Sequence, residues 1–210
     1  MNRRLQLALI ATSWVALAAE RPAIGVLTEF PAGATAAVQQ EFRQETERAM
    51  RAAGMELIWR DLRDSRAEEN FDRLVVIRFR GECAAPKSVS FGGKLPLGLT
   101  HVSNGQVLPF VEIDCQRILE AMYAGDGQAQ FRQEGMIGRA LGRVAAHEIC
   151  HVLTASGTHD EEGLMRPSLD RRDLFAVELS FSAKSIRRLR MSLGPAGPQT
   201  LAQARTNSDD

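Results

Sequence analysis

Apolar and polar positions follow two rhythms along the chain, one typical of strands and one typical of helices. Five short runs rich in branched and aromatic residues predict strands: Ile24–Phe30, Glu56–Arg60, Leu74–Phe79, Leu97–Val102 and Val107–Ile113. The third run is the most apolar, which favours a central place in a sheet. Asn104-Gly105 predicts a hairpin between the last two runs, although Pro109 cannot donate to a ladder.

Helical spacing of apolar residues marks the segments between and after these runs. Four segments predict helices: Ala34–Ala53, Cys115–Tyr123, Gln128–Ala155 and Ser182–Leu193. The third is the longest, and Gly157 is placed to cap its end. Most strands precede the long helix and a mostly helical part follows it. This order predicts one mixed α/β domain of the α+β class.

The two ends of the chain differ from its middle. Residues 1–4 carry two arginines, residues 5–17 are mostly apolar, and Ala16-Leu17-Ala18 fits a small-x-small cleavage site. This plan predicts a secretory signal peptide over residues 1–18. The alternative is an uncleaved membrane anchor, but the run is short for about 30 Å of hydrocarbon. The domain is expected over 19–193, and the polar, proline-containing segment 194–210 is predicted to be a disordered tail.

The charge composition of the chain limits the kinds of partner that the sequence predicts. Lys and Arg number 26, as do Asp and Glu, so the formal net charge is zero. A balanced charge gives no indication of nucleic acid as a partner, or of a membrane once the signal peptide is removed. The predicted signal peptide implies a secreted or periplasmic protein. We expect it to act as a monomer.

An exported protein folds where cysteines oxidise, which changes what the three cysteines imply. We predict a disulfide between Cys83 and Cys115, which leaves Cys150 unpaired. The alternative is three buried thiols.

Three of the four histidines lie within thirteen residues, and two of them form His147-Glu148-Ile149-Cys150-His151. Residues i and i+4 of a helix lie roughly 40° apart around its axis, so both imidazoles reach one metal ion. Glu148 is then placed to act on a metal-activated water as general base. The flanking residues are apolar, and a buried His-Glu-His set is costly unless it has a partner.

A catalytic zinc site needs a third protein ligand. If Gly157 ends the helix in a left-handed turn, the reversed chain brings His159 back toward the metal. Asp160, Glu161 and Glu162 compete for the same role, since each offers a carboxylate oxygen. His159 is favoured because a neutral imidazole preserves the Lewis acidity of the site.

Three other side chains each have two interpretations. Cys150 could approach the metal, but a small buried residue is the commoner explanation. His101 on a predicted strand could touch substrate or could simply be exposed. Met165 could lie near the metal or belong to the core.

The H-E-x-x-H motif, a glycine turn, His159 and Met165 together resemble the zincin metallopeptidases, on the metzincin and archaemetzincin side. The sequence from His147 to Pro167 also resembles that of small secreted bacterial zincin-like proteins. The resemblance implies a five-stranded mixed sheet with Leu97–Val102 as its antiparallel edge above a cleft, and a Met-containing turn beneath the metal. The chain departs from the family at Thr154, where metzincins place glycine, so the helix is expected to run one turn longer.

The resemblance implies a zinc-dependent metalloendopeptidase that acts on peptide or protein substrates. His147, His151 and His159 would bind Zn²⁺, and Glu148 would be the general base. Two rival functions remain: a non-catalytic zincin-like module that binds zinc or a partner, and a zinc hydrolase of a non-peptide amide.

Overall fold

A five-stranded sheet forms the centre of the computed structural model, which describes residues 22–63, 69–84, 96–123, 134–193 and 199–200. Its strands are β1 (Ala23–Glu29), β2 (Glu56–Asp61), β4 (Arg73–Arg80), β5 (Gly98–Ser103) and β6 (Gln106–Asp114). They lie in the order β2-β1-β4-β6-β5, so the most apolar predicted strand is central. Strands β2, β1, β4 and β6 are parallel to one another, and β5 is an antiparallel edge strand paired with β6.

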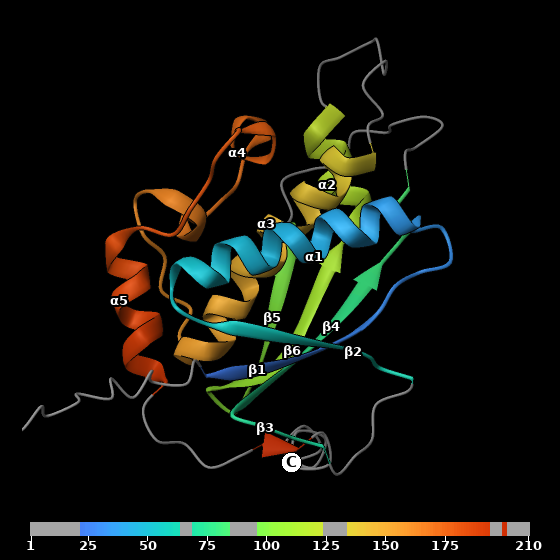
Figure 1. The fold of residues 1–210 in the computed structure, drawn as a ribbon. Helices are drawn as coiled ribbons and strands as arrows, with labels where there is room; N and C mark the ends of the chain where they lie inside the picture. The colour runs from blue at the N-terminus through green and yellow to red at the C-terminus, as the bar shows by residue number, and fades with distance from the viewer. Residues whose placement is uncertain (1–21, 64–68, 85–95, 124–133, 194–198, 201–210) are drawn as a thin grey trace, which may run out of the picture.

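Helices cover one face of this sheet (Figure 1). α1 (Ala36–Ala52), α2 (Cys115–Tyr123) and α3 (Glu134–Thr154) contact its strands. The other two helices, α4 (Arg171–Phe175) and α5 (Ala183–Ser192), and the short 3₁₀ turn η1 (Gly163–Met165) contact α3. Gly142 lets α3 approach α1 closely, because a Cβ there would lie 2.7 Å from the carbonyl oxygen of Phe42. α3 also contacts β5 and β6, and its Glu148 lies against Gly98 of β5.

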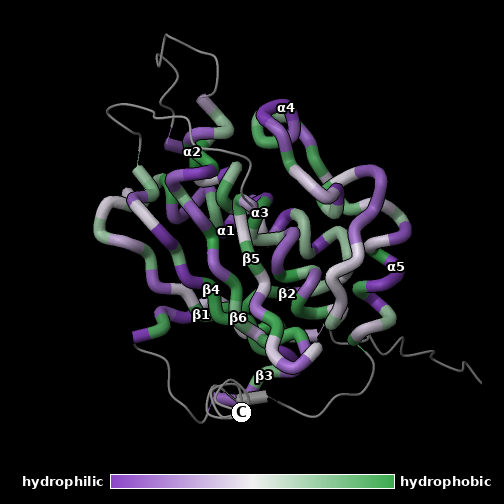
Figure 2. The backbone as a smooth tube through the Cα atoms, turned by 180° about the vertical axis from the view of Figure 1, so that it is seen from behind, coloured by the Kyte–Doolittle hydropathy of each residue, from purple (hydrophilic) through white to green (hydrophobic). Residues whose placement is uncertain are grey.

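The main core lies between the sheet and the helices, and Figure 2 shows the hydrophobic stretches around β4 and β6. A smaller apolar cluster on the opposite face contains Leu27, Phe71, Leu74 and Val76. Phe71 belongs to β3 (Asn70–Phe71), which pairs antiparallel with β7 (Gln199–Thr200). This pairing places Gln199 and Thr200, two residues of the predicted disordered tail, beside β3. The rest of 194–210 lies outside the described residues.

The α+β class and the five-stranded mixed sheet are confirmed, with strand ends within a residue or two of the predicted ones. Both turn residues of the β5–β6 hairpin have positive φ, 49° at Asn104 and 77° at Gly105, as a two-residue hairpin turn requires. Pro109 is accommodated by a shift of register between β5 and β6.

Cys83 and Cys115 form the predicted disulfide, with their Cα atoms 5.0 Å apart. The predicted signal peptide at 1–18 lies outside the described residues. No helix among the described ranges is long and apolar enough to cross a membrane.

Candidate metal centre

The three clustered histidines converge on one point. His147 and His151 face each other from successive turns of α3, with 3.0 Å between their Nε2 atoms. The ring of His159 lies 5.2 Å from the ring of His147 and 4.8 Å from that of His151, centroid to centroid. One nitrogen from each ring lies within 4.8 Å of the other two, so the set could hold a metal ion.

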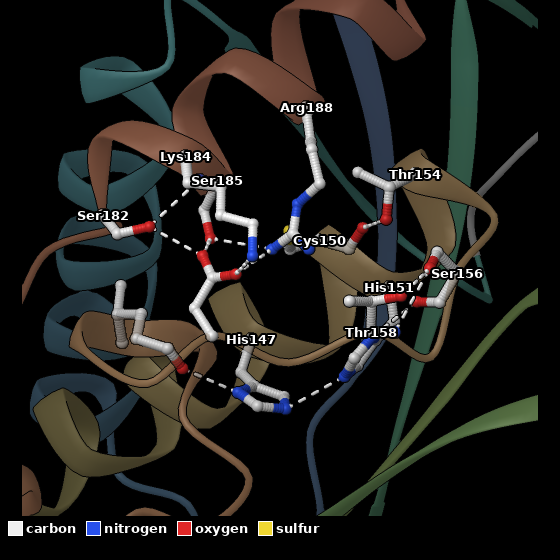
Figure 3. Close-up of polar contacts among 12 residues, drawn as sticks. His147, Cys150, His151, Thr154, Ser156, Thr158, Ser182, Lys184, Ser185 and Arg188 are labelled. Carbon is white, nitrogen blue, oxygen red and sulfur yellow. Dashed lines mark hydrogen bonds and ion pairs between the residues drawn. The ribbon is translucent and has the colours of Figure 1, made fainter.

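Backbone carbonyls fix the tautomers of the two helical histidines. Nδ1 of His147 lies 2.7 Å from the carbonyl oxygen of Leu164, and Nδ1 of His151 lies 2.6 Å from that of Ser156 (Figure 3). A carbonyl only accepts, so each Nδ1 must carry the hydrogen and donate it. In the neutral rings, both Nε2 lone pairs then point at each other over 3.0 Å. Such an arrangement is unfavourable alone and suits a shared cation.

The chain reaches His159 by a tight turn at the end of α3. The N–H of Ser156 donates to the carbonyl of His151 at 3.2 Å, and the N–H of Ala155 donates to that of Val152. This is a Schellman motif, and the residue in the left-handed conformation is Ala155, with φ of 47°. The prediction that Gly157 makes the left-handed turn is therefore wrong. The left-handed residue lies two positions before Gly157, because the last carbonyls of the helix find their donors there.

An alanine with positive φ is strained, and this gives a testable result. Replacing Ala155 with glycine should stabilise the protein by about 1 kcal/mol, since glycine adopts this conformation without the Cβ clash. The comparison is Ala52→Gly, at the exposed last residue of α1, where φ is not positive and glycine should bring no such stabilisation. Urea unfolding measures both free energies, and a destabilised Ala155→Gly variant would contradict the assigned turn.

The carboxylates that compete with His159 lie elsewhere. Asp160 is buried with its carboxylate directed at α5, where it accepts hydrogen bonds from Ser182 and Arg188 at 2.6 and 2.9 Å. Glu161 and Glu162 are exposed. None of the three belongs to the histidine cluster.

Three other candidate side chains also lie outside the cluster. Cys150 is in the hydrophobic core, and burial raises the pKa of its thiol to about 12. His101 is exposed on β5. Met165 is buried in the core, one residue after the carbonyl that supports His147.

Glu148 lies beside the histidines in a pocket formed by β5. The hydroxyl of Thr100 donates to its Oε2 at 2.7 Å. Gly98 makes room for the carboxylate, because a Cβ there would lie 2.9 Å from Oε1. The residue is only 7% exposed, and burial raises the pKa of its carboxyl despite the hydrogen bond from Thr100. One oxygen is thus held by the protein while the other can act on a bound molecule.

The cluster opens into a cleft with a volume of about 920 Å³. Its lining includes the edge strand β5 and the segment Pro167–Asp170. Side chains of α2, including Arg117 and Glu120, line the cleft as well. Leu99 and Val102 of β5 are 49% and 60% exposed. β5 is an edge strand among the described strands, so its outer backbone N–H and C=O groups lie beside these exposed apolar side chains.

Burial governs the charge of the helical histidines. It lowers the pKa of His147 from 6.5 to about 4 and also lowers the pKa of His151. Both rings are therefore neutral at pH 7, which is the form that binds a metal.

The depressed pKa of His147 makes the metal-free protein sensitive to acid. Between pH 6.5 and about 4, His147 is protonated in the unfolded state but stays neutral in the folded state. The free energy of unfolding therefore falls as the pH falls. The loss from this group should be on the order of 3 kcal/mol. Urea unfolding with a chelator present at several pH values tests this. The loss should shrink in His147→Gln but persist in His101→Gln, and an unchanged loss in His147→Gln would contradict it.

No protein-family model matches this chain, and a search of curated proteins finds no match. The interpretation of the site therefore depends on its residues and their geometry.

Four residues that shape the site have no role in the sequence-based prediction: Gly98, Thr100, Ser156 and Leu164. Gly98 alone carries a signal, since a glycine in a strand often marks a close approach. Ser156 and Leu164 act through their backbone carbonyls, which any side chain would provide.

Proposed function

We propose that this protein is an exported zinc metallopeptidase of the zincin type. The observation that carries the proposal is the convergence of His147, His151 and His159 beside the buried carboxylate of Glu148, within one open cleft. Three imidazoles with a glutamate next to the first of them suit a hydrolytic metal better than a structural one. A structural zinc would use four protein ligands and would not need the glutamate.

Zinc is the metal that this donor set favours. Neutral imidazole nitrogens suit Zn²⁺ among the common biological cations, while carboxylate and carbonyl oxygens suit Mg²⁺ and Ca²⁺. His147 and His151 are held ready by the carbonyls of Leu164 and Ser156, which orient the rings and raise their basicity. Three ligands leave the fourth position of a tetrahedral site open to water or substrate.

Zinc bound at this position would polarise a substrate carbonyl and lower the pKa of a water to about 7. Glu148 would take the proton of that water with the oxygen that Thr100 leaves free, as the water attacks the carbonyl carbon. The same carboxyl would then give the proton to the leaving amine. Its burial favours this exchange, because a raised pKa brings the carboxyl closer to the pH at which it works.

The edge strand is suited to an extended peptide. Among the described strands, β5 pairs only with β6, so its outer edge can pair with the backbone of a substrate. Thr100 and Gly98 contact Glu148 from this strand, so a peptide paired with β5 would run past the general base. Peptide or protein substrates are therefore favoured over compact small molecules.

Export follows from the predicted signal peptide and agrees with the Cys83–Cys115 disulfide. We propose a secreted or periplasmic location on this ground.

The test combines metal analysis with digestion of a diverse peptide library. Purified protein should carry close to one zinc per chain, cleave library peptides, lose this activity to a chelator and regain it with Zn²⁺. His159→Ala should bind zinc far more weakly, since a third ligand is lost. Protein that binds one zinc but cleaves no peptide would overturn the peptidase proposal in favour of a binding module or a hydrolase of other amides. Protein that binds no zinc would overturn the metal site itself.

A further inference from the structure

Asp160 is the residue next to His159, and its carboxylate is buried under four groups. Ser182 and Arg188 donate to it at 2.6 and 2.9 Å, Ser185 also donates to it, and the Nζ of Lys184 lies 3.6 Å away. The residue is 6% exposed. A buried charge with this many partners holds its backbone firmly in place.

All four partners belong to the first turns of α5 or to its N-cap. Ser182 is the N-cap residue and accepts from the backbone N–H of Ser185 at 3.0 Å. A carboxylate at a helix N-terminus is further stabilised by the helix dipole. The labelled α5 residues gather on one side of Figure 3, away from His147 and His151. The backbone N–H of Asp160 donates to the carbonyl of Met165 at 2.7 Å. Hydrogen bonds therefore hold both the backbone and the side chain of this residue.

His159 lacks the support that the other two histidines have. Carbonyl oxygens hold Nδ1 of His147 and His151, whereas no hydrogen bond from any described residue reaches a ring nitrogen of His159. Its ring is also less buried than the other two. The place of this ring must therefore be set by its backbone, which is anchored one residue later at Asp160.

We propose that Asp160 is a positioning residue: by anchoring the chain to the N-terminus of α5, it holds His159 where the third metal ligand is needed. The inference rests on the metal site of the proposed function but not on any substrate. It makes the docking of α5 and the binding of the metal two coupled events. Loss of a comparable supporting contact at metal sites costs 10- to 100-fold in affinity.

A double-mutant cycle on zinc affinity tests this, with a fluorescent chelator as competitor. The four proteins are the wild type, Asp160→Asn, His159→Ala and the double variant. Asp160→Asn should weaken zinc binding about tenfold in the wild-type background. In the His159→Ala background it should change the affinity less than twofold, because the ligand through which Asp160 acts is gone.

Two controls keep the result interpretable. Glu161→Gln removes a charge from the adjacent exposed position and should leave zinc affinity unchanged. Ser185→Ala removes one donor to Asp160, a milder change that should weaken zinc binding in the same direction. Circular dichroism of each metal-free variant establishes that it is folded at the assay temperature.

The proposal is overturned if Asp160→Asn binds zinc as tightly as the wild type. It is equally overturned if the variant loses the same factor with and without His159, since that is general destabilisation. A wild type that binds no zinc would instead refute the metal site, so the two failures are distinct.

Discussion

Replacing Glu148 with glutamine should lower peptide turnover by about 10²- to 10⁴-fold while zinc stays bound, since general acid–base catalysis contributes a factor of this size. Glutamine has nearly the same shape and still accepts from Thr100, which donates to Oε2 at 2.7 Å in the wild type. It has no basic oxygen with which to take a proton from water. Steady-state rates on the best library peptide, together with zinc content, measure the two effects separately.

The matched control is Glu120→Gln, which removes a carboxylate from the same cleft at α2. This variant should retain the rate within a few fold. A Glu148→Gln protein with wild-type turnover and full zinc would show that another group is the base. A protein that loses zinc and activity together would leave Glu148 with a structural role in the site.

Replacing Arg143 with methionine should destabilise the protein by about 3–5 kcal/mol, the range for breaking a buried ionic pair. The side chain is fully buried in α3, where Nε donates to Glu45 at 2.7 Å. Nη1 donates to the carbonyl of Asp173 at 2.5 Å, and Nη2 donates to that of Ala176 at 2.7 Å. Methionine fills much of the volume but leaves these carbonyls without a donor.

Arg139→Met, one turn earlier on α3 at a partly exposed position, should change the free energy of unfolding by less than about 1 kcal/mol. Urea unfolding at pH 7 without metal compares the two variants. An Arg143→Met protein as stable as Arg139→Met would contradict the role given to the buried network.

Arg143 also connects α3, the helix that carries His147 and His151, to the lining of the cleft. Its guanidinium holds the carbonyl end of α4, and the lining segment Pro167–Asp170 leads directly into that helix. Asp170 caps α4 by accepting from the N–H groups of Arg172 and Asp173. One arginine on α3 therefore holds in place the helix that follows the lining segment Pro167–Asp170. The pattern of residues around Arg143 does not predict this role.

The parts of the fold that could be predicted are those set by neighbours in the sequence. Leu74–Phe79 is apolar on both faces and is central, and Asn104-Gly105 has the backbone freedom that a two-residue hairpin needs. His147 and His151 meet because helix geometry alone places residues i and i+4 on one side. Short-range rules suffice where the competing forces are local.

The remaining features depend on contacts between distant residues. β3 and β7 were missed, since a two-residue pairing carries no periodic signal. The left-handed turn occurs at Ala155 despite the nearby glycine, because the helix carbonyls find their donors there. A single-residue preference of about 1 kcal/mol is easily outweighed by such contacts.

The sequence by itself determined that a helix carries two histidines and a glutamate at metal-binding spacing, because that spacing is a property of the helix. Only the tertiary structure decided which side chain, an imidazole or a carboxylate, joins His147 and His151 as the third member of the cluster. His159 and Asp160 are adjacent, and both side chains could serve as a metal ligand. The start of α5 and its N-cap, however, supply Asp160 with three hydrogen-bond donors and a helix N-terminus. That burial turns the carboxylate away from the cleft and leaves His159 facing the other two histidines.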